Sequence, residues 1–279
     1  MKKMIFGVVA ASALTLGMAQ VAKAQAGEYF ATLGAGGFLS PDYEGSDDFK
    51  VRGTPVVVLG WKADAVTPKG GTGIQLGLHD IALKVPGKLD VGLARLYRPE
   101  GLYRLNFGLA YKGGRDEDNN QALEGMGDID GHVLAKAGIS FRTKGPGWRY
   151  SVNFLQDVSG ETDGSSVDGE LGYFRPLGKK LFLTPFASIS WADQDYMQSY
   201  FGVSPEQAGT SSNAQFDADS GIKSVGLGVK LNWKIKGNWK LNNTLRYVRL
   251  TGDAADSPLV ETEGSANQFS VKTALVYTF

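Results

Sequence analysis

Apolar and polar residues alternate along most of this chain, often over ten or more residues at a time. In residues 224–235 every second residue is large and apolar, and the residues between are serine, glycine, asparagine or lysine. Because successive side chains of a strand point to opposite faces, each such strand has one apolar and one polar face. Residues 103–112 and 267–279 repeat the pattern with aromatic residues on the apolar face. Strands of this length predict a transmembrane barrel rather than a soluble β-sandwich.

About twelve segments carry this pattern. We expect strands at 28–38, 50–61, 72–80, 89–97, 102–112, 130–142, 147–158, 167–175, 180–192, 219–235, 238–250 and 267–279. Alternation is weakest in 89–97 and 167–175, which leaves ten strands as an alternative. The predicted fold is an all-β, antiparallel transmembrane β-barrel of about 12 strands (10–14), whose even strand number places both ends of the domain on one side.

The connections between these segments sort by length and by charge. Short turns at 98–101, 143–146, 176–179 and 236–237 fall on one side and lean basic. Long, acidic connections at 39–49, 113–129, 193–218 and 251–266 fall on the other side. Short periplasmic turns and long extracellular loops are typical of outer-membrane barrels, with 62–71 as the one longer periplasmic connection. The acidic loops are either ordinary solvated loops or ligands for divalent cations that bridge to lipopolysaccharide.

The two ends of the chain carry a predicted export signal and a predicted insertion signal. Lys2 and Lys3 precede the apolar run 4–16, and Ala22-Lys23-Ala24 forms a small-x-small cleavage site. These features predict a signal peptide at 1–24 and a barrel domain at 25–279. The terminal aromatic strand predicts recognition by the barrel-assembly machinery, and therefore insertion into lipid of the outer membrane. The residues of this insertion signal are Phe279, Tyr277 and Leu275.

Charge and residue counts exclude several classes of function. Without 1–24 the chain has 26 Lys and Arg against 29 Asp and Glu, a formal charge of −3, which does not favour nucleic acid. Cysteine is absent, which excludes disulfides and thiolate metal sites. The two histidines, His79 and His132, are on or near the lumen-facing set, and no Gly-x-Ser-x-Gly or zinc-binding pattern accompanies them. We therefore predict no catalytic residues, no metal and no cofactor.

The inward face of the predicted barrel is basic. By alternation its acids are fewer than its bases, and they include Asp90, Asp157, Asp168 and Glu170. The bases are Arg52, Arg104, Lys112, Lys136, Arg142, Arg149, Lys230, Lys240, Arg246 and Lys272. Long side chains can cross and close a narrow lumen, or they can line a small channel that favours anions.

Several loop motifs point to a known family. They are 40–47 (SPDYEGSD), 113–119 (GGRDEDN), 125–129 (GMGDI), 202–207 (GVSPEQ) and 250–258 (LTGDAADSP). In order and over most of the chain, they resemble the MipA/OmpV family of MltA-interacting protein-like outer-membrane proteins, with Met126 where the family commonly has leucine. The resemblance implies a non-enzymatic scaffold linking murein (peptidoglycan) hydrolase and synthase. Relatives treated as adhesins or porin-like proteins supply the alternatives.

The residues of these motifs suit turns and caps at the outer rim. We interpret them as packing motifs that fold the long loops over the barrel mouth, with Arg115 pairing with nearby carboxylates; direct ligand contact is the alternative. The residues are Pro41, Asp42, Tyr43, Gly45, Ser46, Asp47, Arg115, Asp116, Asp118, Asp128, Asp253, Asp256, Ser257 and Pro258. For a periplasmic partner, the candidate contact residues are Lys62, Asp64 and Lys69 on the longer connection.

Overall fold

The computed structural model describes residues 28–62, 73–77, 81–85, 101–143 and 145–279. Each strand in this part of the chain pairs antiparallel with its sequence neighbours, and β1 also pairs with β12, so that the ladder forms a closed barrel. The strands are β1 Glu28–Pro41, β2 Phe49–Lys62, β3 Gly73–Gly77, β4 Ile81–Val85, β5 Gly101–Lys112, β6 His132–Thr143, β7 Gly147–Asp157, β8 Ser165–Pro176, β9 Leu181–Ala192, β10 Gly221–Lys234, β11 Trp239–Leu250 and β12 Asn267–Thr278. The predicted antiparallel barrel of about twelve strands is confirmed.

The two segments with the weakest alternation are 89–97 and 167–175, and only the second is among the described residues. Residues 167–175 lie within β8, a full-length strand that pairs with β7 and β9. The expected strand at 89–97 lies outside the described residues. Residues 81–85, which we expected to be a connection, instead form β4 between β3 and β5. β4 ends and β5 begins at the rim where β2 ends, and residues 86–100 between them lie outside the described residues, as do 63–72.

The outer wall of the barrel is apolar. Leu227 is 64% exposed, Leu109 60% and Phe107 53%, and all three belong to the predicted outward set. So many large exposed apolar side chains would be unfavourable in water but suit a wall that contacts lipid. The barrel hydrogen bonds satisfy the backbone groups that lipid cannot. Among the described residues, no helix is long and apolar enough to cross a bilayer.

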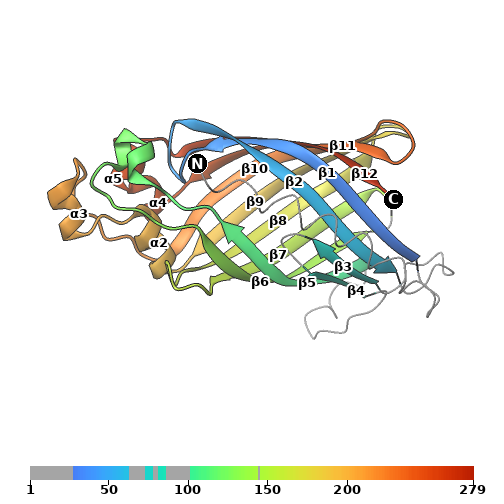
Figure 1. Cartoon of the computed structure of the whole chain (residues 1–279), viewed down its shortest axis with the longest axis horizontal. Coiled ribbons are helices and arrows are strands. Elements are labelled where there is room, and N and C mark those ends of the chain that lie inside the picture. The colour runs from blue at the N-terminus through green and yellow to red at the C-terminus, as the bar shows by residue number, and fades with distance from the viewer. Residues whose placement is uncertain (1–27, 63–72, 78–80, 86–100, 144) are drawn as a thin grey trace, which may run out of the picture.

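Short helices gather at one end of the barrel (Figure 1). They are η2 Glu117–Asn119, η3 Gln121–Leu123, α2 Gln194–Phe201, α3 Pro205–Thr210, α4 Asp253–Asp256 and α5 Pro258–Glu261. Side-chain caps start the two longer ones: Asp193 accepts from the amide of Tyr196, and Ser204 with Gln207 forms a capping box before α3. The opposite end has the short turns after β6, β8 and β10. This is the predicted asymmetry of long outer loops and short periplasmic turns.

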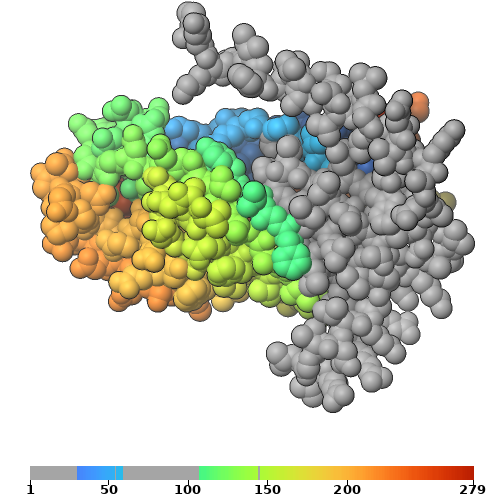
Figure 2. Space-filling model, turned by 60° about the horizontal axis from the view of Figure 1, so that its bottom comes forward, coloured from blue at the N-terminus to red at the C-terminus, as the bar shows by residue number. Residues whose placement is uncertain are grey.

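The outer loops build a hydrophobic core of their own, which we call the cap. One cluster of buried residues centres on α2 and includes Met197 and Phe201, and a second includes Leu123, Met126 and Leu259. Each of these five side chains is at most 2% exposed. In Figure 2 the green loop after β5 and the orange loop with α3 lie against each other at the outer end. The cap therefore packs like the interior of a soluble domain.

Candidate functional site

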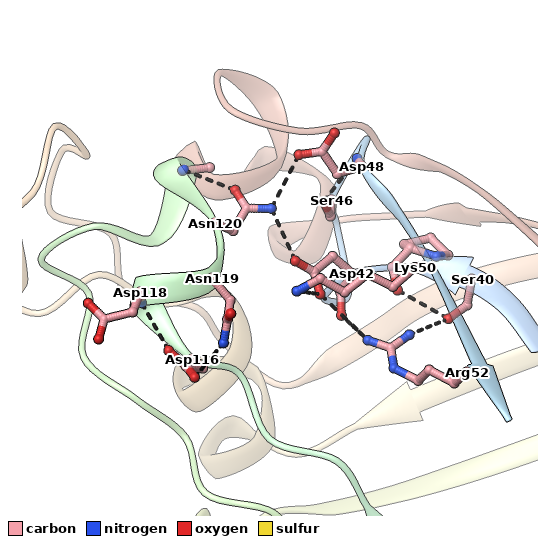
Figure 3. Close-up of polar contacts among 12 residues, drawn as sticks. Ser40, Asp42, Ser46, Asp48, Lys50, Arg52, Asp116, Asp118, Asn119 and Asn120 are labelled. Carbon is pink, nitrogen blue, oxygen red and sulfur yellow. Dashed lines mark hydrogen bonds and ion pairs between the residues drawn. The ribbon is translucent and has the colours of Figure 1, made fainter. Parts of the chain in front are cut away.

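The first outer loop is fixed by a buried carboxylate. Asp42 pairs with Lys50 at 2.7 Å and with Arg52 at 3.5 Å, both on β2. The side-chain amide of Asn120, between η2 and η3, donates to Asp42 at 3.3 Å and to Asp48 at 3.4 Å (Figure 3). The loop between β1 and β2 is thereby tied to the loop between β5 and β6.

The loop between β5 and β6 is shaped by its own acids. Asp116 caps η2 by accepting from the amide of Asp118 at 2.9 Å (Figure 3). The amide of Glu117 donates to Asp128, and the carboxylate of Glu117 accepts from the amide of Gly127, both at 2.9 Å. Carboxylates that accept backbone amides in this way order a turn without any ligand.

Gly45 joins the first loop to the last. Its φ of +108° favours glycine, and a Cβ there would lie 2.5 Å from Cγ2 of Val260. Its carbonyl accepts from the amide of Ser265 at 2.8 Å. The side chain of Gln268 accepts from the amide of Gly45 and donates to the carbonyl of Ser46. The loop between β1 and β2 therefore contacts the loop between β11 and β12 directly.

The last outer loop is held by hydroxyl groups. The buried Ser257 donates from Oγ to the carbonyl of Phe201 at 2.6 Å, and Tyr43 donates to the carbonyl of Leu259 at 3.3 Å. Burial and neighbouring carboxylates raise the pKa of Tyr43 to about 12, so it remains a donor at physiological pH. Asp253 accepts from the amide of Asp219 at 2.7 Å.

The other motif residues also lie in or beside these loops. Pro41 ends β1, Ser46 is 2% exposed, Asp47 is exposed, Asp256 ends α4 and Pro258 begins α5. The structure thus brings the predicted outer-loop residues together at one end of the barrel.

A buried charged cluster lies beneath the cap, where the loops meet the lumen. We call Glu44, Lys112, Tyr196, Tyr200 and Lys223 the cap-base cluster. Glu44 forms ion pairs with Lys223 and, at 3.5 Å, with Lys112, and it accepts from the Tyr196 hydroxyl at 2.6 Å. Lys223 donates to the same hydroxyl at 2.8 Å, and the Lys112 ammonium lies 3.5 Å from the Tyr200 ring centroid. The cluster joins β5 and β10 to the first loop and to α2.

The ionisation of Glu44 follows from these contacts. Burial alone would raise its pKa, but the Lys223 and Lys112 ammonium groups and the hydrogen bonds from Lys223 and Tyr196 lower it to about 2. Burial and the adjacent Glu44 carboxylate raise the pKa of the Tyr196 hydroxyl well above its ordinary value. Glu44 is therefore an anion and Tyr196 a neutral donor at physiological pH.

Arg115 and His132 both form hydrogen bonds with Tyr200 of α2. Arg115 is 5% exposed and donates to the carbonyl of Tyr200 at 3.3 Å. Among the described residues it has no carboxylate within ion-pair distance, so the expected pairing of Arg115 with a carboxylate is wrong. The reason is that nearby acids are taken by backbone amides, as Asp128 is by Glu117. His132 is buried and contacts the Tyr200 hydroxyl at 3.1 Å and the carbonyl of Asp130 at 2.9 Å.

Four cluster residues were predicted neither as site residues nor as part of the inward set: Glu44, Tyr196, Tyr200 and Lys223. Strict alternation assigns Lys223 to the lipid-facing set with Val225. A bulge between Ile222 and Ser224 adds one residue to the ladder and turns Lys223 inward. A lysine in the lipid-facing set is itself the signal for such a bulge, because an ammonium there is unfavourable. Glu44 stands in the middle of the first motif and could have been included with it.

The remaining predicted site residues are those of the periplasmic contact, His79 and the C-terminal insertion signal. Asp64, Lys69 and His79 lie outside the described residues, and Lys62 ends β2. At the C-terminus, the ring of Tyr277 contacts Trp239 and Phe279 at centroid distances of 5.0 and 4.7 Å. Leu275 and Phe279 are exposed on the same outer face, and the amide of Phe279 donates to Ala31. No three acidic or histidine side chains in the described part of the chain are arranged to hold a metal.

The family of this chain follows from its sequence over nearly the whole described barrel. The model of the family described as "MltA-interacting protein MipA" matches residues 33–279. The chain belongs to the MipA family. This match covers every described strand and the whole cap except for the first residues of β1, and it confirms the resemblance of the loop motifs to MipA/OmpV proteins.

Named relatives agree with this assignment. Over 183 residues the chain is 32% identical to outer membrane protein Omp26La of Vibrio anguillarum and to outer membrane protein OmpV of Vibrio cholerae. Each alignment covers 64% of this chain and 65% of the relative, just under two thirds of its length. The MltA-interacting protein of Escherichia coli is 25% identical over 38% of this chain and 41% of that protein. The MipA-family chain is an outer-membrane protein.

Similar solved structures are also outer-membrane proteins. In vitro folded OmpT of Vibrio cholerae aligns over 92% of this chain and 99% of its own, with 6% identity and a TM-score of 0.39. The NanC porin aligns over 88% and 98%, with 9% identity and a TM-score of 0.38. Similarity at this level carries no information on what the MipA-family chain binds.

Proposed function

We propose that this chain is a non-enzymatic scaffold of the outer membrane, whose partners bind at the periplasmic rim. The observation that carries the proposal is the cap, because a packed core over the outer mouth suits a structural element better than an open pore. Phe201, Met197 and Leu259 are each at most 1% exposed, and they come from two different loops. With the packed cap at the outer end, the periplasmic rim is the face turned toward the cell wall.

The partner class follows from the name of a relative. The relative from Escherichia coli is named MltA-interacting protein, and we extend an interaction of this kind to the present chain. The partner would be a murein hydrolase or synthase in the periplasm. The candidate contact is the connection 62–71, with Lys62 and Lys69 beside Asp64. Because one exposed ion pair contributes about 0–1 kcal/mol, binding should be modest and weakened by salt.

Capture of a murein enzyme by the purified barrel tests this proposal. The full-length protein in detergent should retain a lytic transglycosylase or a murein synthase on a resin at low salt. Replacing 62–71 by a two-residue Asn-Gly turn should weaken capture while heat-modifiable mobility stays that of a folded barrel. Glu124→Gln, an exposed change in the cap, is the matched control and should capture as the unchanged protein does. Undiminished capture by the shortened barrel would remove this contact, and no capture by the intact protein would remove the scaffold role.

A small channel that favours anions is the second candidate. It is supported by the surplus of inward bases over inward acids: Glu170 pairs with Lys230, but Lys240 and Lys272 have no acidic partner among the described residues. In planar bilayers with asymmetric salt, any conductance should be small and should prefer anions. Cation selectivity would contradict this candidate.

A further inference from the structure

We propose that the periplasmic third of the lumen holds a binding site for a small polyanion that carries phosphate or carboxylate groups. Its residues are Arg142 on β6, Arg149 on β7, Lys234 on β10 and Lys240 on β11, which we call the basic arc. The inference goes beyond the scaffold role and does not depend on it.

Strand register pairs the four cations of the basic arc two by two, each pair beside a short turn at the periplasmic rim. Arg142 is directly opposite Arg149, and Lys234 is directly opposite Lys240. Side chains directly opposite in an antiparallel pair point to the same face, with Cβ atoms about 5 Å apart. The residues next to Lys234 and Lys240 in sequence are Trp233 and Trp239, both exposed on the outer wall. The two lysines therefore face the lumen.

Two phenylalanine rings on the intervening strands connect the pairs. Phe174 on β8 and Phe182 on β9 are stacked, with centroids 5.8 Å apart and planes 10° apart. The Arg149 guanidinium carbon lies 3.9 Å from the Phe174 centroid, and the Lys234 ammonium lies 5.0 Å from the Phe182 centroid. Cation–π contacts hold both groups in place without neutralising their charge. Six neighbouring strands, β6 to β11, thus supply one continuous basic and aromatic wall.

The basic arc differs from the lumen lysines that have acidic partners. Lys230 lies four residues before Lys234 on β10 and pairs with Glu170. The two lysines of the cap-base cluster share Glu44. In the described part of the chain, none of the four cations of the basic arc forms an ion pair. Nε of Arg149 is also buried without a hydrogen-bond partner there. An unpartnered buried donor and like charges directly opposite on neighbouring strands are both unfavourable, and a bound anion would relieve both.

The geometry selects the chemistry of the ligand. Guanidinium groups donate in a planar fork that matches phosphate and carboxylate oxygens, whereas lysine acts as a point charge. Two guanidinium groups and two ammonium groups along one wall suit an anion with several charges better than a monovalent one. Tripolyphosphate and citrate are suitable probes, because they represent the phosphate and carboxylate forms of this chemistry.

Isothermal titration calorimetry of the full-length protein in zwitterionic detergent tests the site. Tripolyphosphate or citrate should bind at about 50 mM NaCl, and binding should weaken at about 500 mM. The stronger of the two ligands identifies the form of the anion. The double variant Arg142→Gln/Arg149→Gln should lose at least about tenfold in affinity, the loss expected for charge-assisted bidentate contacts. Arg175→Gln, an exposed change on the neighbouring strand β8, is the control and should bind as the unchanged protein does.

A second variant keeps the test informative if the arginine changes impair folding. Lys234→Gln/Lys240→Gln alters the other side of the basic arc and should also weaken binding while heat-modifiable mobility is retained. Absence of binding by the intact protein at low salt overturns the proposal. Equal losses in the Arg175→Gln control would show binding to general surface charge and would overturn it as well.

Discussion

Glutamine at position 44 tests the ion pairs of the cap-base cluster. Glu44→Gln keeps the shape of the side chain but leaves Lys112 and Lys223 facing each other without an anion. Lowering a carboxyl pKa from 4.5 to about 2 corresponds to about 3 kcal/mol of stabilisation by the charged form. Removing one partner of a buried pair costs about 3–5 kcal/mol. Because the Glu44 side chain is 26% exposed, we expect a smaller loss than for a fully buried pair, about 2–3 kcal/mol.

The loss should concentrate in the cap, because strand pairing in the barrel does not depend on Glu44. Hydrogen–deuterium exchange of the α2 amides should become about 30- to 150-fold faster in the variant, which converts the same 2–3 kcal/mol at about 1.4 kcal/mol per factor of ten. Amides in the middle of β7 and β8 should be unaffected. Glu124→Gln, an exposed carboxylate of the same cap, is the control and should leave α2 exchange unchanged.

The pH dependence gives an independent check. The folded pKa of Glu44 lies below its ordinary value, so the folded cap binds fewer protons than the opened one. The stabilisation is therefore complete above about pH 4.5 and is lost as the pH falls toward 2. Protection of α2 in the unchanged protein should decrease across this window more than in Glu44→Gln. Equal protection of α2 in the two proteins at pH 7 would refute the assigned role of the cluster.

Three further changes have definite expectations. Gly45→Ala places a Cβ against Val260 at a positive φ and should destabilise the cap by about 1–3 kcal/mol, measured by limited proteolysis of the outer loops. Ser257→Ala leaves the buried carbonyl of Phe201 without its donor and should cost about 1–3 kcal/mol in the same assay, whereas normal protease resistance would contradict the hydroxyl's role. Deletion of Phe279 should slow membrane insertion and leave misassembled chain, and unchanged heat-modifiable mobility would count against the insertion signal.

The barrel could be predicted from the sequence because lipid selects one face of every strand. Where that rule acts on long strands, as in 224–234, Val225, Leu227 and Trp233 of the predicted outward set are exposed. It fails where local geometry changes the count: the bulge at Lys223 reverses one side chain without any change in the surrounding pattern. It also fails at 81–85, which forms the five-residue strand β4 where we expected a connection, because alternation over so few residues does not fix a boundary.

The interior of the cap could not be predicted in the same way. The sequence indicates long acidic loops with turn-forming motifs, but no period relates Glu44 to Tyr196, whose contact spans 152 positions. Which acids accept backbone amides and which pair with lysine depends on how four loops pack together. Arg115 illustrates this, because its buried partner is a carbonyl group of α2 rather than one of the many carboxylates nearby in sequence.

The separate core of the cap means that one chain must fold in two solvents. The strands reach their native state by turning leucine and tryptophan outward to lipid, whereas the cap turns phenylalanine and methionine inward from water. The Tyr43–Leu259 hydrogen bond joins residues 216 positions apart, on the loops that flank the β1–β12 seam. Such non-local contacts carry a large entropic cost until the intervening chain is in place. The cap should therefore form last, after the seam has closed, so that resistance of its loops to protease reports completed assembly of the barrel below.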